Sequence, residues 1–180
     1  QLRVSTSVAF GRRVLTPLAL RFMVEHPDII LDLSFEDRYV NLVEQGIDVA
    51  LRMGRLADSQ LGARYLGLNP WVLVGAPAYL KQRGTPTLPQ DLAAHDALVY
   101  STVQGDERWT FVGHDGQPLV VPVRGPLRSN NLSALLSAAR GGMGLAVLPW
   151  YVANDSVRGG AVQPLLTDWA LPAQDIHAVF

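Results

Sequence analysis

Short apolar runs alternate along this chain with stretches whose apolar residues recur at helical spacing. Ala9–Glu25 carries such a pattern and predicts a long helix. Val40–Gln45 predicts a second helix, and Gly46 after it is suited to a left-handed helix cap. Three apolar or alternating runs predict strands around these helices: Leu2–Ser5, Ile29–Phe35 and Ile47–Leu51. This order predicts a βαβαβ unit with right-handed crossovers.

The rest of the chain repeats the α/β pattern. Pro77–Gln82, Trp150–Ala153 and the stretch after Asn131 predict helices, and Asp115-Gly116 predicts a hairpin turn. The predicted strands are Leu61–Leu68, Trp71–Gly75, Ala97–Ser101, Trp109–Val112, Leu119–Val123, Leu145–Leu148, Val162–Leu166 and Ile176–Phe180. We therefore expect two α/β lobes, residues 1–71 with 170–180 and residues 72–169. Two chain crossings would make a hinged pair with a cleft.

The long first helix has two features that its spacing alone does not explain. Pro17 predicts a kink, because proline cannot donate a helix hydrogen bond. Leu20 and Val24 extend the apolar surface beyond the main stripe. A helix that is apolar nearly all round needs cover on two sides, so we expect the sheet on one side and a second subunit on the other.

Composition narrows the possible functions. The 180 residues carry a net charge of -1, which gives no basic field for nucleic acid, so the chain is a poor DNA binder in itself. It has no cysteine, which excludes disulfides and thiolate chemistry, and its four histidines lack helically spaced partners. We expect no metal and no cofactor. No apolar run reaches the roughly 20 residues of a membrane span, and no export leader is visible. We expect a cytoplasmic protein that is a piece of a longer chain.

Hydroxyl and amide side chains stand where strands lead into helices. Ser5–Ser7 precedes the first helix, and Ser129–Asn131 repeats the arrangement later. Free N–H groups and hydroxyls at such a place favour a carboxylate, although an ordinary helix cap is the alternative. Arg52 follows the central strand and could pair with a carboxylate in bidentate fashion. The alternative for Arg52 is a surface ion pair with Asp58 or Asp37.

Other sequence features carry little chemistry. No Gly-x-Ser-x-Gly elbow surrounds any serine, and Gly141–Gly144 follows a helix, which is the reverse of a dinucleotide loop. Trp109 could form the wall of a pocket for an aromatic ligand. We do not expect an enzyme, because no nucleophile with a base, and no metal set, can be assembled.

Six stretches distributed over most of the length of the chain resemble the effector-binding domain of a LysR-type transcriptional regulator. They are LRVSTSVAFG, LTPLALRFMVEHPDIILDL, LVEQGIDVALRMG, GAPAYLKQRGTPTLPQDLAAHDALVY, RWTF and LLSAARGGMGLAVLPWYV. The resemblance implies a type 2 periplasmic binding protein-like fold. In that fold two Rossmann-like lobes are joined by two crossover strands, and a small effector binds between the lobes.

The resemblance also implies site residues and partners. Effector contacts are expected from the turn before the first helix and from the loops after two strands. With Arg52 and Asn130, taken from their places at strand ends, the expected ligand-binding residues are Thr6, Ser7, Phe35, Glu36, Arg52, Tyr100, Ser101 and Asn130. The effector would be a carboxylate or an aromatic acid.

The family pairs such domains antiparallel, which implies a homodimer, or a tetramer in the full-length protein. DNA would be bound only through an N-terminal winged helix-turn-helix that this sequence lacks. The alternative function is a transporter's solute-binding protein, for which an export leader and a monomer would be expected.

Overall fold

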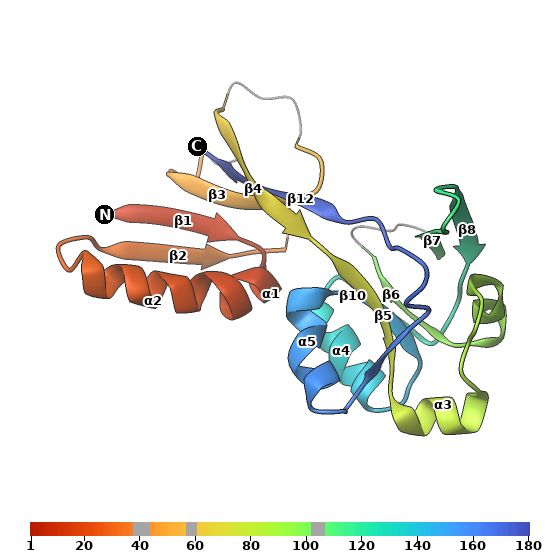
Figure 1. Cartoon of the computed structure of the whole chain (residues 1–180). Coiled ribbons are helices and arrows are strands. Elements are labelled where there is room, and N and C mark those ends of the chain that lie inside the picture. The colour runs from red at the N-terminus through yellow and green to blue at the C-terminus, as the bar shows by residue number, and fades with distance from the viewer. Residues whose placement is uncertain (38–43, 57–60, 102–106) are drawn as a thin grey trace. The chain divides into compact units, whose positions relative to one another are not determined.

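The structure is a computed structural model that describes the chain except for residues 38–43, 57–60 and 102–106 (Figure 1). It divides into two compact units, Gln1–Asn69 with Gln174–Phe180, and Pro70–Ala173. Each unit is built on a mixed five-stranded sheet, so the α/β fold with two lobes is confirmed.

The first sheet has the strand order β2-β1-β3-β12-β4. Its strands are β1 (Leu2–Thr6), β2 (Leu31–Phe35), β3 (Val49–Met53), β4 (Ala63–Asn69) and β12 (Gln174–Val179). Both β2 and β3 run parallel to β1, whereas β12 is antiparallel to β3 and β4. The carboxyl ends of β1, β2 and β3 therefore meet at one edge.

Strand β3 begins and ends two residues later than the sequence pattern predicts. The Asp48 carboxylate accepts a 2.8 Å hydrogen bond from the backbone N–H of Arg3, and the Asp48 N–H donates to the Arg3 carbonyl at 3.0 Å. This pairing anchors Asp48 just before the strand. Gly46 has a φ of 63°, as expected of a left-handed cap. The predicted helix Val40–Gln45 lies mostly outside the described residues, and its last two residues form a turn.

The long first helix is interrupted, but not as predicted. It consists of α1 (Val8–Phe10), a π-helical turn (Gly11–Leu15) and α2 (Thr16–Glu25). The Thr16 N–H bonds the Gly11 carbonyl, five residues back, and the Thr16 hydroxyl donates to the same oxygen at 2.8 Å. Pro17 therefore lies in the first turn of α2, where its missing N–H costs little. The π-helical turn thus ends directly before the position at which the sequence predicts a kink.

The second sheet has the strand order β11-β5-β10-β6-β9. Its strands are β5 (Trp71–Gly75), β6 (Ala97–Tyr100), β9 (Leu127–Ser129), β10 (Leu145–Pro149) and β11 (Gln163–Leu165). The helices are α3 (Pro77–Arg83), the 3-10 helix η2 (Pro89–Ala94), α4 (Leu132–Arg140) and α5 (Trp150–Arg158). The predicted hairpin forms from β7 (Arg108–Val112) and β8 (Pro118–Pro122). Strand β6 runs parallel to β9 and β10, and α4 and α5 pack on the sheet.

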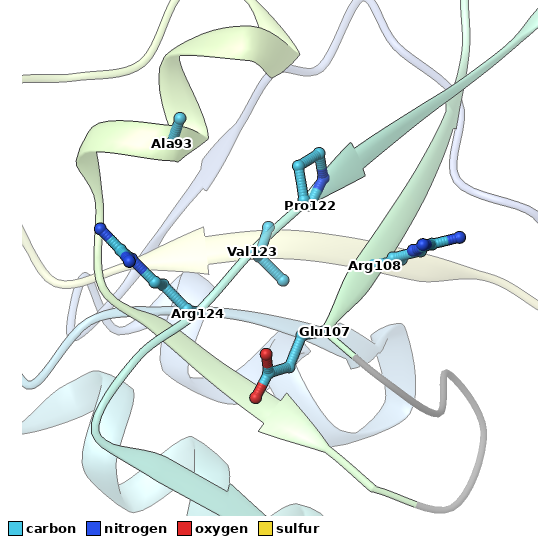
Figure 2. Close-up of a pocket in the computed structure, with 6 residues that line it drawn as sticks. All are labelled: Ala93, Glu107, Arg108, Pro122, Val123 and Arg124. Atoms are coloured by element: carbon cyan, nitrogen blue, oxygen red, sulfur yellow. The ribbon is translucent and has the colours of Figure 1, made fainter.

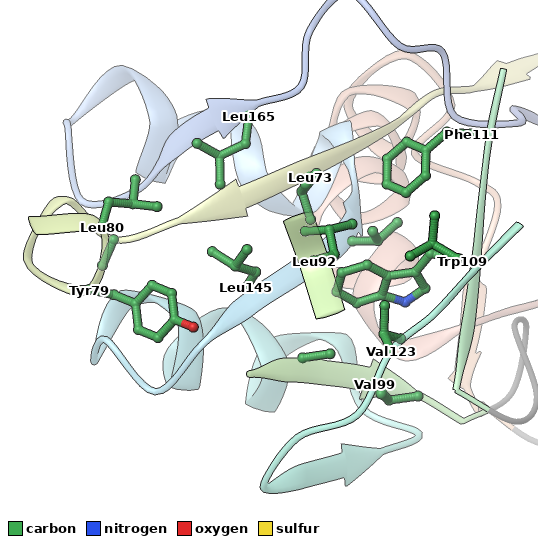
Figure 3. Close-up of a cluster of buried hydrophobic side chains, with 14 residues drawn as sticks. Leu73, Tyr79, Leu80, Leu92, Val99, Trp109, Phe111, Val123, Leu145 and Leu165 are labelled. Atoms are coloured by element: carbon green, nitrogen blue, oxygen red, sulfur yellow. The ribbon is translucent and has the colours of Figure 1, made fainter. Parts of the chain in front are cut away.

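The largest aromatic side chains of the second unit are in its core. Trp109 is only 2% exposed and lies beside Leu92 and Val123, while Phe111 is fully buried (Figure 3). The suggestion that Trp109 forms the wall of a ligand pocket is therefore wrong. The β7–β8 hairpin places the Trp109 side chain against η2 and the sheet.

None of the described helices combines the length and the apolarity needed to cross a bilayer.

Candidate functional site

The carboxyl edge of the first sheet brings together Thr6, Ser7, Phe35, Glu36 and Arg52, which we call the first strand-end group. Thr6 is paired in register with Phe35. Its hydroxyl donates to the Leu51 carbonyl at 3.1 Å, and its carbonyl accepts from the Glu36 N–H at 2.9 Å. Thr6 thus ties the ends of three strands together, and its hydroxyl proton is already used within the protein.

Ser7 occupies the cap position of α1 but does not act as the cap. Its side chain makes no capping hydrogen bond, and the Val8 N–H donates instead to the Asp37 carboxylate at 3.0 Å. The Ser7 hydroxyl oxygen is buried and has no hydrogen-bond partner in the part of the chain that the structure describes. A buried hydroxyl without a partner is unfavourable, so this one is poised to bond an added group.

The π-helical turn is fitted closely to Phe35. A Cβ atom placed on Gly11 would lie 2.5 Å from Cδ1 of the Phe35 ring, so only glycine fits at this position. Glu36 follows, and its carboxylate accepts a long 3.4 Å hydrogen bond from the Ser34 hydroxyl. The half-buried aromatic ring and the carboxylate thus lie next to the Ser7 turn. π-helical turns of this kind often mark functional sites.

Arg52 lies inside β3, not after it as the sequence pattern predicts. It is only 8% exposed and is paired in register with His177 of β12. The strand continues to Met53 because β12 pairs with it there. Arg52 is therefore a buried cation near the strand end. Asp58, one of the two acids considered as its ion-pair partner, lies outside the described residues.

Sequence reasoning missed a buried amide at the same edge. Asn69, the last residue of β4, is 2% exposed, and its amide nitrogen lies 3.3 Å from Oε1 of Gln174 and 3.7 Å from the Met53 sulfur. The only signal in the sequence is an asparagine between an apolar strand and Pro70. Asn69, Gln174 and Met53 thus lie at the border of the first strand-end group, on the side of β12.

The carboxyl edge of the second sheet brings together Tyr100, Ser101 and Asn130, which we call the second strand-end group. Tyr100 is paired with Ser129, and the Ser101 N–H donates to the Ser129 carbonyl at 3.0 Å. Asn131 caps α4 by accepting from the Ala134 N–H at 3.0 Å. Asn130 is exposed beside this cap and is not used by it.

An aromatic pair adjoins the second strand-end group. The Tyr100 and Trp71 rings lie 6.0 Å apart between centroids and are inclined at 33°. Trp71 is the first residue of β5, so the pair joins two strands of the sheet.

Among the described residues, no cluster of three or more His, Cys, Asp or Glu side chains could hold a metal ion. The first group thus offers hydroxyl, carboxylate, cationic and aromatic side chains, and the second offers hydroxyl, amide and aromatic ones.

Comparison with known proteins decides the family. The family model described as the LysR substrate binding domain matches residues 1–180. The chain belongs to this family. It is thus the effector-binding regulatory domain of a LysR-type regulator, and it is not an enzyme.

Individual relatives agree with this assignment. An uncharacterized HTH-type transcriptional regulator of Haemophilus influenzae is 30% identical over 179 residues, which cover 99% of this chain and 62% of the relative. The HTH-type transcriptional regulator CrgA of Neisseria meningitidis serogroup C is 31% identical over 167 residues, which cover 93% of this chain and 55% of CrgA. The chain therefore spans less than two thirds of these relatives.

The structure is also similar to solved structures. The CrgA regulatory domain from Neisseria meningitidis superposes with a TM-score of 0.87 at 28% identity, covering 99% of this chain and 87% of that one. That protein is described as a LysR-type transcriptional regulator, so the fold and the family assignment agree.

Proposed function

We propose that the first strand-end group binds the carboxylate of a small effector, with Ser7 as its central hydrogen-bond donor. The observation that supports this most is the buried Ser7 hydroxyl, which has no partner among the described residues and does not cap the helix. A carboxylate oxygen would accept its proton. Ser7 also stands at the start of the helix that begins with α1, and the positive end of a helix favours an anion at the same place.

The second strand-end group supports an aromatic acid as the effector. The tilted Tyr100–Trp71 pair offers an aromatic surface, and Ser101 and Asn130 offer polar contacts beside it. Phe35 adds a half-buried ring in the first group. In this proposal all eight strand-end residues take part in effector binding.

In the whole protein, effector binding would control transcription from the cytoplasm through a separate DNA-binding domain. The relatives are named HTH-type regulators, and the chain covers only part of their length. An effector can shift such a protein between states only if it binds one state more tightly than the other. The competing function, a solute-binding protein of a transporter, would give binding without any change in DNA affinity.

A ligand panel tests the binding proposal. We expect one or more small aromatic or aliphatic acids to raise the melting temperature of the wild-type chain, because a ligand of the native state stabilises it by mass action. The Ser7→Ala variant should respond more weakly to the same compounds. A matched control is Ser137→Ala, at an exposed position in the second half of α4 in the other unit. Equal affinities for wild type and Ser7→Ala would remove Ser7 from the site.

We also propose that α2 forms a homodimer interface. Leu20 and Val24 on this helix are 59% and 82% exposed, although both are large and apolar. We expect Leu20→Asp or Val24→Asp to shift the chain from dimer to monomer in sedimentation experiments. Val120→Asp is the matched control, because Val120 is 52% exposed on the β7–β8 hairpin. A wild-type chain that is monomeric at high concentration would contradict the proposal.

A further inference from the structure

Two adjoining hollows in the Pro70–Ala173 unit lie away from the second strand-end group. One has a volume of about 480 Å³ and lies over Pro122 and Val123 (Figure 2). The other, of about 360 Å³, reaches His95 and Asp96. Both are lined by Ala93 and Arg124, and together we call them the arginine hollow. It borders the start of β6, whereas Tyr100 lies at the end of that strand.

The arginine hollow has an excess of positive charge. Arg83, Arg108 and Arg124 line it, against the two acids Glu107 and Asp96. Glu107 is paired with Arg128 at 3.1 Å, and Asp96 is paired with Arg83 at 3.1 Å. The side chains of Arg108 and Arg124 make no ion pair or hydrogen bond with any described residue. Two arginines thus remain available in a chain whose net charge is -1.

The backbone holds Arg124 in place. Its carbonyl accepts a 2.9 Å hydrogen bond from the N–H of Ala97, the first residue of β6. Gly125 follows, and a Cβ atom there would clash with the Ala97 carbonyl oxygen, so the chain passes directly against the strand. On the other side the Val123 N–H donates to the Glu107 carbonyl at 2.7 Å. The Arg124 side chain therefore projects from a fixed point.

A buried histidine supplies a second donor. His95 is 8% exposed and lines the hollow, and its Nδ1 lies 3.2 Å from the Tyr79 hydroxyl oxygen. That oxygen also accepts from the Asp96 N–H at 2.9 Å. In the tautomer in which Nδ1 accepts the Tyr79 proton, the His95 ring proton is on Nε2. Burial lowers the pKa of His95, which favours this neutral form.

We propose that the arginine hollow is a second ligand site that binds an oxyanion through the Arg124 guanidinium and the His95 Nε2–H. A planar guanidinium bonds two oxygens of a phosphate or carboxylate at once. Figure 2 shows the Arg108 and Arg124 side chains on opposite sides of Val123, extending away from each other, so Arg124 and His95 form the anion-binding end of the site. The ligand is therefore a small molecule that carries a phosphate or carboxylate group.

Calorimetric titration at fixed ionic strength tests this site, with inorganic phosphate and citrate as separate probes. We expect saturable binding of one or both probes, and sodium chloride should give no such isotherm. Preference for phosphate would assign a phosphorylated ligand, and preference for citrate a polycarboxylate. Absence of saturable binding of both probes would overturn the proposal.

Variants locate the binding. Arg124→Gln should weaken the affinity for the bound probe about tenfold or more, because a charge-assisted hydrogen-bond pair is lost. His95→Gln should also weaken it. Arg158→Gln is the matched control, since Arg158 is exposed at the end of α5. Equal weakening by Arg124→Gln and Arg158→Gln would mean nonspecific attraction. Weakening by Arg124→Gln without weakening by Ser7→Ala assigns the bound probe to this site. Weakening by Ser7→Ala alone would assign the probe to the proposed effector site and overturn this proposal, so the two sites can fail independently.

Discussion

Replacing Ser7 with alanine should make the domain more stable and less able to bind its effector. The Ser7 hydroxyl is buried without a partner among the described residues, and Asp37 provides the cap. Burying an unpaired hydroxyl costs about 1–3 kcal/mol, so removing it should increase the free energy of unfolding by about 1 kcal/mol. For a chain of this size, that corresponds to a melting temperature about 2–4 °C higher.

The effector affinity should change in the opposite sense. A hydrogen bond from a hydroxyl to a carboxylate contributes about 1.5–3 kcal/mol, so Ser7→Ala should raise the dissociation constant roughly tenfold to a hundredfold. Titration calorimetry with a compound identified in the panel measures this, and scanning calorimetry of the unliganded chain measures stability.

Thr6→Val is the contrasting variant for this experiment. It removes the 3.1 Å hydrogen bond to the Leu51 carbonyl, so it should lower the free energy of unfolding by about 1 kcal/mol. Two results would refute the reasoning. A less stable Ser7→Ala chain would mean that the hydroxyl has an internal partner, and unchanged affinity would mean that it does not contact the effector.

Two further predictions concern the second unit. Burial lowers the pKa of His95 in the folded chain. As the pH falls, His95 of the unfolded chain is therefore protonated at a higher pH, near its ordinary pKa of about 6.5, than His95 of the folded chain. Stability should therefore be full above that pH and fall as the pH drops toward the lowered value, and His95→Gln should flatten this slope in urea unfolding between about pH 7.5 and 5. Gly125→Ala should destabilise the chain by about 1–3 kcal/mol, because its Cβ would meet the Ala97 carbonyl. In the same unfolding assay Gly141→Ala should cost much less, since a Cβ there meets nothing closer than 3.4 Å.

The fold was predictable because local signals agree with it. Apolar runs gave the strands, and Asp115-Gly116 gave the β7–β8 hairpin. The errors arise where a distant residue decides the outcome. Asp48 is bonded to Arg3 just before β3 begins, and pairing with β12 carries β3 past Arg52. Neither contact can be inferred from the local pattern of apolar and polar residues.

The helix start shows the same limit at the candidate site. A serine before a helix predicts a side-chain cap, and nothing near Ser7 in the sequence contradicts that. The cap is Asp37, which the fold brings from the loop after β2. The sequence could therefore nominate Ser7 as a site residue but could not show that its hydroxyl is left unused.

These long-range contacts explain how a small ligand could be sensed. The Ser7 turn is bonded to the β2 loop through Asp37, and Thr6 is bonded to β3 through Leu51. A group that bonds the Ser7 hydroxyl therefore acts on the ends of three strands. One of them, β3, also pairs with β12, whose first residue, Gln174, is hydrogen-bonded to Asn69, where the chain leaves this unit. The proposed ligand contact and the chain crossing are thus connected through one strand, β3.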